Sequence, residues 1–200
     1  VLIRTATLRD KEGNPLKIVG VILDIDRAKK SEQQLTTRAS FDALTELYNR
    51  ETIESQIDNE ITLSEARKSE MAVLFIDVDD FKHYNDQYSH ATGDQVLKFV
   101  ARTIKGTVNE FGFAGRYGGD EFIACIRNAE INDPTRAAQD IISKLEEGFE
   151  CDGVHLTVSV SIGISMIKDD YNTRVEYIIG KADDAMYSVK KNGKSNYAFI

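Results

Sequence analysis

The order of hydrophobic and polar positions divides the chain into three stretches of different character. Alternating positions over residues 2–8 and a β-branched run over 16–25, separated by a turn-rich segment, predict two strands. Residues 27–40 are polar and helix-favouring, with apolar positions near heptad spacing, and predict a helical connector. Because two strands alone do not make a stable domain, the main core is expected after residue 40.

From residue 41 onward, helical and strand patterns are mixed without strict βαβ alternation, and a hairpin lies in the middle. This order favours an α+β fold with a largely antiparallel sheet over a doubly wound parallel one. The expected helices cover residues 49–68, 80–88, 94–107, 134–149 and 174–191, with Asn49 capping the first, and the expected strands cover 71–78, 113–117, 121–127, 154–167 and 197–200.

The composition is that of a globular protein. The 200 residues are 42% hydrophobic and 29% charged, with 13 Gly and 2 Pro, which excludes disordered and collagen-like chains. Apolar runs such as 71–76 are far shorter than the roughly 20 residues of a membrane span, and the start lacks the apolar core of a signal peptide. We expect a cytoplasmic domain from a longer chain, which could itself be membrane-anchored.

The net charge of −8 argues against binding to nucleic acid, which needs a basic surface. An anionic substrate would instead have to be met by local lysines or a metal ion. Cys125 and Cys151 show neither metal-ligand spacing nor a disulfide framework, so both are expected to be reduced thiols.

Three carboxylates and a lysine stand at the end of the apolar strand: Asp77, Asp79, Asp80 and Lys82. Because carboxylates are costly to desolvate, this position needs an explanation. Helix capping accounts for Asp79 or Asp80, but not for Asp77. In an extended strand Asp77 and Asp79 point to the same side, and such a group of hard oxygens suits Mg²⁺.

A second acidic group follows the double glycine Gly118–Gly119, where Asp120 and Glu121 begin a strand. An ordinary hairpin turn explains the glycines but not the two adjacent acids. If this hairpin lies beside the strand that ends near Asp77, then Asp77 and Asp120 form a two-carboxylate metal site of the kind used in phosphoryl and nucleotidyl transfer.

Seven motifs occur in order after residue 41, and together they resemble the GGDEF domain, the catalytic module of diguanylate cyclases. The resemblance covers residues 41–200 and implies a nucleotide-cyclase-like palm with a central, mostly antiparallel five-stranded sheet flanked by helices. The motifs are Asp42-x-Leu44-Thr45-x-Leu47-x-Asn49-Arg50, Asp77-Val78-Asp79-Asp80-Phe81-Lys82-x-x-Asn85-Asp86, His90-x-x-Gly93-Asp94, Arg116-Tyr117-Gly118-Gly119-Asp120-Glu121-Phe122, Ser159-Val160-Ser161-Ile162-Gly163, Ala182-Asp183-x-Ala185-Met186-Tyr187 and Lys190-x-x-Gly193-Lys194-Ser195-Asn196.

The resemblance implies a role for each matching residue. Asp94 suits guanine because its carboxylate accepts two N–H groups for which adenine has no matching pair. Solvated helix surface is the plain alternative for Lys82 and Lys190. The implied metal ligands for Mg²⁺, with Mn²⁺ as a substitute, are Asp77, Asp120 and the carbonyl of Val78; the catalytic group is Asp120, Glu121 and Lys82; and the substrate-binding group is Asn85, His90, Asp94, Gly119, Lys82, Lys190 and Arg116.

By the same resemblance, two GTP molecules condense into cyclic di-GMP with release of two pyrophosphates. Each domain would bind one GTP, and the 3′-hydroxyl of one would attack the α-phosphorus of the other, which requires a two-fold homodimer. Two alternatives stay open: a catalytically silent GTP-binding regulatory module, and a palm that acts on other nucleotides. The retained Asp77 and Asp120 argue against the first, and Asn85 and Asp94 against the second.

Three features depart from the family's pattern. Residues 109–112 (Asn109, Glu110, Phe111 and Gly112) stand where the family has an Arg-x-x-Asp motif for product inhibition, so no such site is expected. Ser89 replaces the glycine before His90, which puts the geometry of that loop in question. Lys194 replaces an arginine, which keeps the charge but loses bidentate geometry.

The front of the chain resembles the last two strands of a PAS sensor domain. The similarity lies in Arg9-Asp10-x-x-Gly13-x-Pro15 and in the run 19–27. Residues 1–26 would then be the C-terminal part of a PAS domain, and 27–40 a signalling helix that couples an upstream sensor to the cyclase dimer.

Overall fold

The computed structural model describes residues 2–23, 40–168 and 173–200. The chain divides into two compact units, Val1–Ala39 and Ser40–Ile200. Apart from residue 40, the connector expected at 27–40 lies outside the described residues.

The first unit contains the expected pair of strands. Strand β1 (Leu2–Arg9) pairs antiparallel with β2 (Pro15–Leu23). Their turn is held by Asp10, whose Oδ1 accepts hydrogen bonds from the backbone N–H groups of Glu12 and Asn14 at 2.9 Å each. Apolar side chains of the hairpin, including Leu8 and Leu16, are exposed.

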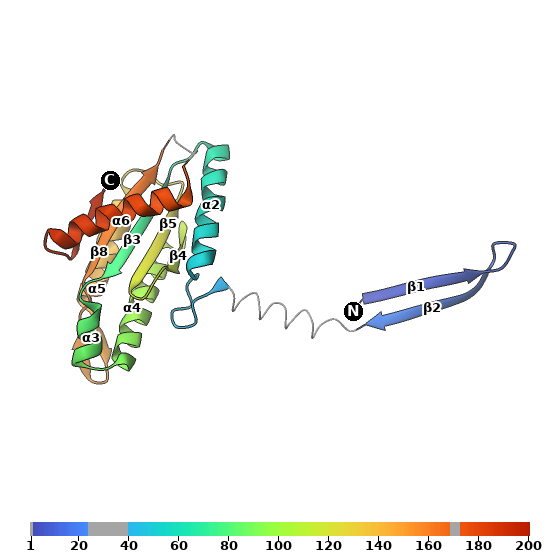
Figure 1. Cartoon of the computed structure of the whole chain (residues 1–200), viewed down its shortest axis with the longest axis horizontal. Coiled ribbons are helices and arrows are strands. Elements are labelled where there is room, and N and C mark those ends of the chain that lie inside the picture. The colour runs from blue at the N-terminus through green and yellow to red at the C-terminus, as the bar shows by residue number, and fades with distance from the viewer. Residues whose placement is uncertain (1, 24–39, 169–172) are drawn as a thin grey trace. The chain divides into compact units, whose positions relative to one another are not determined.

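The second unit is built on the five-stranded sheet that the sequence predicts (Figure 1). Its strand order is β4-β5-β3-β8-β9, and all neighbours are antiparallel except β8 and β9. The α+β class is therefore confirmed. The strands are β3 (Met71–Val78), β4 (Gly112–Arg116), β5 (Glu121–Arg127), β8 (Val160–Ile167) and β9 (Asn196–Phe199).

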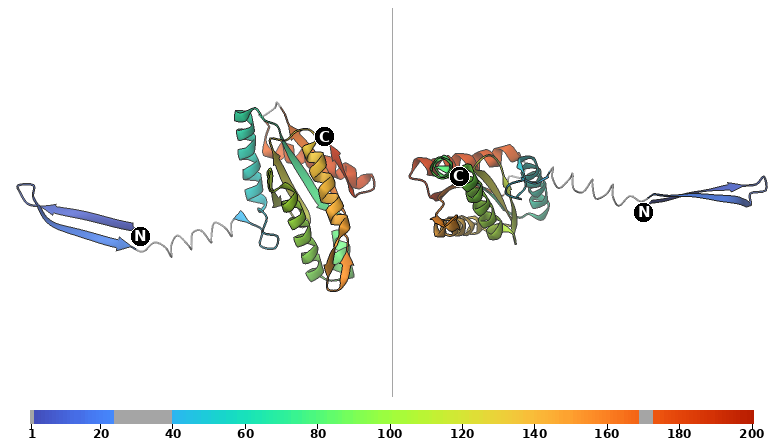
Figure 2. Two further views of the ribbon diagram at one scale, coloured as in Figure 1. Left: turned by 180° about the vertical axis from the view of Figure 1, so that it is seen from behind. Right: turned by 90° about the horizontal axis from the view of Figure 1, so that it is seen from below.

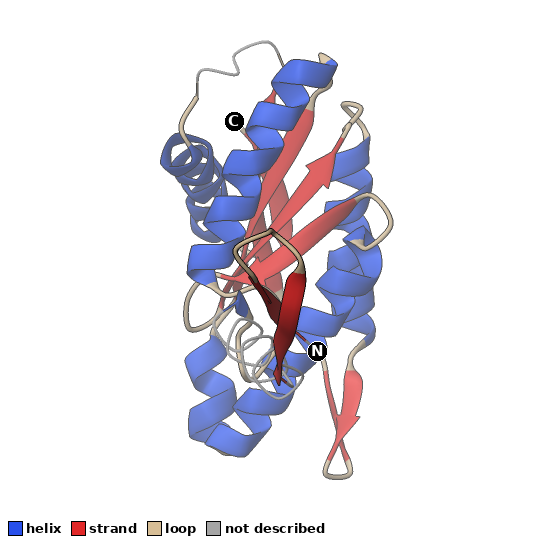
Figure 3. Cartoon of the chain, turned by 90° about the vertical axis from the view of Figure 1, so that its right-hand side faces the viewer, coloured by secondary structure: helices blue, strands red, loops and turns tan. Residues whose placement is uncertain are grey.

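Helices cover both faces of this sheet and make three layers (Figure 3). Helix α6 (Val175–Lys191) crosses the near face in Figure 1, and α2 (Arg50–Arg67) packs on the same side. Helices α4 (His90–Val108) and α5 (Asp133–Glu147) cover the other face, which the left view of Figure 2 presents. The short α3 (Phe81–Gln87) follows the end of β3.

Strand β3 is buried along its whole length, and its side chains alternate between the two layers. Met71, Val73 and Phe75 pack with α2 and α6, whereas Leu74 and Ile76 pack with α4 and α5. By this alternation Asp77 continues the row that faces α6.

Three of the expected elements have a wrong boundary. Helix α4 begins at His90 and not at residue 94, because the Ser89 hydroxyl accepts a hydrogen bond from the Thr92 N–H and caps the helix earlier. The strand expected over 154–167 is broken into β7 (Val154–Leu156) and β8, and β7 pairs with β6 (Phe149–Cys151) in a separate hairpin.

Tertiary contacts explain the break in that strand. The carbonyl of Thr157 accepts a hydrogen bond from the Tyr84 hydroxyl, and the Val158 N–H donates to the carbonyl of Leu145. These groups are used by α3 and α5, so they are not available to a continuous strand ladder. The helix expected at 134–149 ends at residue 147, because Gly148 leaves the helical conformation with φ 76° and Phe149 begins β6.

The close approach of α6 to β8 gives a test of the layer packing. A Cβ atom at Gly163 would lie 1.9 Å from the carbonyl oxygen of Ala182 and 2.2 Å from the Met186 nitrogen. We expect Gly163→Ala to lower the free energy of unfolding by roughly 2 kcal/mol or more in urea titration. The matched control is Gly180→Ala in α6, where nothing lies within 4 Å of the new Cβ, and this change should stabilise by about 0.5–1 kcal/mol. Equal effects would contradict the packing.

Candidate active site

The site begins at Asp77, near the end of β3. Asp77 stands opposite Glu121 of β5 and Ser161 of β8, and only 6% of its surface is exposed. The Val78 N–H donates to the carbonyl of Asp120 at 3.2 Å. The hairpin therefore lies beside the strand end, as the two-carboxylate interpretation requires.

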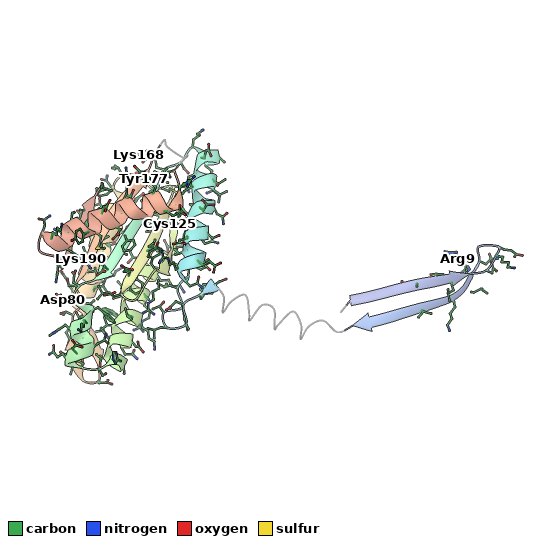
Figure 4. All side chains as sticks on the ribbon, in the orientation of Figure 1. Arg9, Asp80, Cys125, Lys168, Tyr177 and Lys190 are labelled. Carbon is green, nitrogen blue, oxygen red and sulfur yellow. The ribbon has the colours of Figure 1, made fainter. Side chains whose placement is uncertain are left out.

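Lys190 of α6 pairs with Asp77, with Nζ 2.6 Å from Oδ1. The Lys190 ammonium group also lowers the pKa of Asp77 as a hydrogen-bond donor, and apart from it Oδ1 has no hydrogen-bond donor among the described residues. A buried carboxylate that is held by a single ammonium group is costly in a purely structural role. Figure 4 labels Lys190 and Asp80, which lie at the same end of the sheet.

The environment of Asp77 disfavours its ionised form. Burial raises the pKa of Asp77 to about 6, the neighbouring charge of Lys190 opposes this rise, and the carboxylates of Asp120 and Glu121 add to it. Burial, together with Asp120 and Asp183, also raises the pKa of Glu121. A divalent cation would relieve the repulsion among these acids.

Asp79 does not cap α3, contrary to one of the two capping options. Its carboxylate accepts hydrogen bonds from the hydroxyls of Ser159 (2.5 Å) and Ser161 (2.8 Å) and from the Ser195 N–H (3.2 Å). Asp79 therefore ties the end of β3 to the start of β8 and to the turn between α6 and β9. Ser161 stands opposite Asp77 in the sheet. Through its hydrogen bond to Ser161, Asp79 therefore contacts a direct neighbour of Asp77.

Asp80 occupies the N-cap position of α3 but makes no capping hydrogen bond with its side chain. Lys194 Nζ instead lies 2.8 Å from both oxygens of the Asp80 carboxylate, and this contact lowers the pKa of Asp80. The single ammonium group thus contacts both oxygens, although it replaces an arginine of the family pattern.

Arg116 holds the hairpin in shape. Its guanidinium donates to the carbonyls of Gly118 (3.2 Å) and Gly119 (2.6 Å) and, through Nη1, to both oxygens of Asp42 (3.2 and 3.3 Å). Asp42 also accepts from the backbone and hydroxyl of Thr45. These bonds give Arg116 a role in positioning the hairpin, and its expected contact with the substrate stays a prediction.

The sequence predicts no site role for Asp42 or Asp183. Asp42 belongs to a quoted motif, but only its distance from Arg116, which is far away in sequence, shows that it supports the hairpin. Asp183 of α6 raises the pKa of Glu121. This effect can be recognised only from the tertiary structure, in which α6 lies across the sheet.

The residues expected at the nucleotide base lie on α3 and α4. Asn85 packs against Gly93, where an added Cβ would lie 2.1 Å from Asn85 Oδ1. Asp94 and His90 are exposed on the first turns of α4, and Lys82 is exposed on α3. The loop placed in question by Ser89 is the capped start of α4. A cleft of about 460 Å³ runs beside α3 and includes Asp79, Asp80 and Lys194 in its walls.

The residues present fit a hard divalent cation. Two carboxylates, Asp77 and Asp120, and a nearby backbone carbonyl could supply oxygen ligands, and Lys190 already shows that a cation can reach Asp77 Oδ1. Within the described ranges, no three His, Cys, Asp or Glu side chains gather into a ready-made metal cage. Mg²⁺ needs none, because it commonly binds through one or two carboxylates together with substrate phosphates.

Comparisons with known proteins identify the family. The family model described as "Diguanylate cyclase, GGDEF domain" matches residues 39–196, so the chain belongs to this family of nucleotidyltransferases. The bifunctional diguanylate cyclase/cyclic di-GMP phosphodiesterase MucR of Pseudomonas aeruginosa is 34% identical over 171 residues, which are 86% of this chain and 25% of that protein. Diguanylate cyclase DosC of Escherichia coli is 35% identical over 158 residues, 77% of this chain and 34% of that protein.

Solved structures agree on the fold. The coiled coil and GGDEF domain of DgcB from Caulobacter crescentus superposes with a TM-score of 0.82 at 24% identity, covering 88% of this chain and 93% of that one. The GGDEF domain of TpbB, or YfiN, from Pseudomonas aeruginosa has a TM-score of 0.75 at 32% identity, covering 80% and 93%. The chain spans well under two thirds of the length of the curated relatives named above. No helix in the described part of the chain is long and apolar enough to cross a membrane.

The raised pKa of Asp77 predicts a pH dependence of stability in metal-free buffer. The folded state binds this proton more tightly than the unfolded chain, whose Asp77 titrates near 3.8. The stabilisation is therefore complete below that value and is lost as the pH rises through about 6. Relative to Asp77→Asn, the wild-type domain should lose roughly 2 kcal/mol of unfolding free energy across this window.

Denaturant titrations of both proteins with a chelator present would measure that difference. Asp79→Asn is the matched control, because its carboxylate is fully hydrogen-bonded and the change should destabilise the fold. A pH-independent difference between wild type and Asp77→Asn would contradict the assignment.

Proposed function

We propose that this chain is a diguanylate cyclase that condenses two GTP into cyclic di-GMP and two pyrophosphates. The observation that carries the proposal is Asp77, a buried carboxylate that is paired with Lys190 and lies beside the GGDEF hairpin that carries Asp120. Relatives that are named as diguanylate cyclases support the same reaction.

Asp77, Asp120 and the carbonyl of Val78 would hold Mg²⁺. When bound, the cation offsets the charge that develops on the phosphate and favours the alkoxide form of the attacking hydroxyl. Asp120 stands at the hairpin surface, where it can assist removal of the 3′-hydroxyl proton, and Glu121 raises the negative charge around it.

The substrate would lie between the hairpin and the two helices that follow β3. Lys82 and Lys190 are the cations for the phosphates, and Asn85 and Asp94 read the guanine edge, with His90 beside the nucleotide. The exposed backbone at Gly119 allows close approach, and Arg116 keeps its carbonyl in place. Mn²⁺ is expected to substitute for Mg²⁺ because both are hard cations with oxygen ligands.

One domain binds one GTP, so the reaction requires a two-fold homodimer in which two sites face each other. We further propose that residues 1–26 belong to a PAS sensor domain and that 27–40 connect it to the cyclase. The exposed Leu8 and Leu16 support this part, since strands with such side chains normally pack against a further layer.

The direct test is to incubate the chain at high concentration with GTP and Mg²⁺ and to identify the product by mass spectrometry. We expect cyclic di-GMP from GTP, none from ATP, and none from Asp120→Asn. Tight Mg²⁺-dependent GTP binding without product, even in a forced dimer, would instead support the silent regulatory module.

Asp94 provides a test of base recognition. Asp94→Ala should weaken GTP binding by about 10-fold or more, because two hydrogen bonds to guanine are lost, while leaving the unfolding free energy nearly unchanged at this exposed position. Calorimetric titration with GTP and ATP measures both affinity and selectivity. Unchanged preference for GTP would exclude Asp94 as the guanine reader.

The sequence at 109–112 predicts an enzyme without product inhibition through that segment. Initial rates should stay constant as cyclic di-GMP is added, because Asn109 and Gly112 replace the charged residues of the family motif. Micromolar binding of cyclic di-GMP that is abolished by substitutions near residue 109 would show the prediction to be wrong.

A further inference from the structure

Lys190 stands where a cation is needed. Its Nζ lies 2.6 Å from Asp77 Oδ1, an oxygen that has no other hydrogen-bond partner among the described residues. A carboxylate this deeply buried is strongly destabilised unless a positive charge lies next to it. In the ligand-free domain, that charge is the ammonium group of Lys190.

The backbone of Lys190 is fixed while its side chain is not. The neighbouring Val189 and Met186 are buried in the core, and the backbone of α6 touches β8 at Gly163. The Lys190 side chain itself is 31% exposed, so the ammonium group can leave Asp77 by rotation of side-chain bonds alone.

We propose that Lys190 is an exchangeable counter-ion of Asp77. In the free protein its ammonium group neutralises the Asp77 carboxylate. When a nucleoside triphosphate binds, the ammonium group moves to the phosphates and the metal ion replaces it at Asp77. The inference rests on the proposed function, because it concerns the same metal and phosphate groups. It adds an order of binding: the metal enters with the triphosphate, and the free metal ion binds weakly.

The balance of charges at Asp77 explains why binding of the metal and binding of the triphosphate are coupled. A metal ion that displaces Lys190 without an anion loses the existing ion pair and leaves the ammonium group unpaired. A triphosphate removes this penalty because it offers Lys190 a new anionic partner. By linkage, the triphosphate must strengthen metal binding by the same factor as the metal strengthens triphosphate binding.

Lys194 is a matched control within the same segment. It is also an ammonium group near the end of α6, but it contacts Asp80 and not Asp77. Its charge acts on Asp77 only at a distance, so removing it should change metal binding at Asp77 much less than removing the charge of Lys190.

The experiment measures Mn²⁺ binding to the nucleotide-free protein by electron paramagnetic resonance at about pH 8, where Asp77 is ionised. Lys190→Met should bind Mn²⁺ about 10-fold or more tightly than wild type, since a competing cation is gone. Lys194→Met should stay much closer to wild type than Lys190→Met does, and the double variant Lys190→Met with Asp77→Asn should lose the gain. Lys190→Gln serves as a second variant, and circular dichroism checks that each protein is folded.

A second titration adds a GTP analogue whose α,β-bridge cannot be cleaved. In wild type the analogue should strengthen Mn²⁺ binding, and in Lys190→Met this coupling factor should be smaller, because only the direct contacts between the metal and the phosphates remain. Equal Mn²⁺ affinities of wild type and both Lys190 variants would overturn the inference even if cyclic di-GMP is formed. A gain in affinity without product from GTP would leave the exchange intact and reject the proposed function.

Discussion

A negative charge buried at the end of the central strand is the constraint around which the site is arranged. Strand β3 is covered on both faces, so Asp77 is buried together with the other residues of this strand. Burial raises its pKa, and the neighbouring acids of the hairpin raise it further. A fold that keeps such a group must supply a cation, and the cation at hand is Lys190 of the helix that covers this row.

The surrounding polar contacts hold the parts that meet at Asp77. Asp79 connects β3, β8 and the turn after α6 through three hydrogen bonds, while Arg116 connects the hairpin to the segment before α2 through Asp42. Each of these charged groups has several hydrogen bonds, whereas Asp77 Oδ1 depends on Lys190. The contrast separates residues that position the site from the residue whose partner a ligand can replace.

Much of the fold could be predicted from the local pattern. The five strands of the main sheet, the hairpin at Gly118–Gly119 and the Asn49 cap are all present, because strand alternation, turn glycines and capping residues act over a few positions. The errors lie where distant groups compete. The strand expected over 154–167 is interrupted because α3 and α5 take its backbone groups, and α4 starts early because Ser89 caps it.

The sequence by itself determined the family, the row of acids after the buried strand and the glycine hairpin, since each depends on residue type and spacing along the chain. Only the tertiary structure decided which partner each acid contacts. Asp77, Asp79 and Asp80 are nearly adjacent, yet they contact Lys190, a set of serine donors and Lys194, respectively. These partners come from segments about 80 to 115 residues away, and their distances follow from how α6 packs across β8 and not from any local pattern.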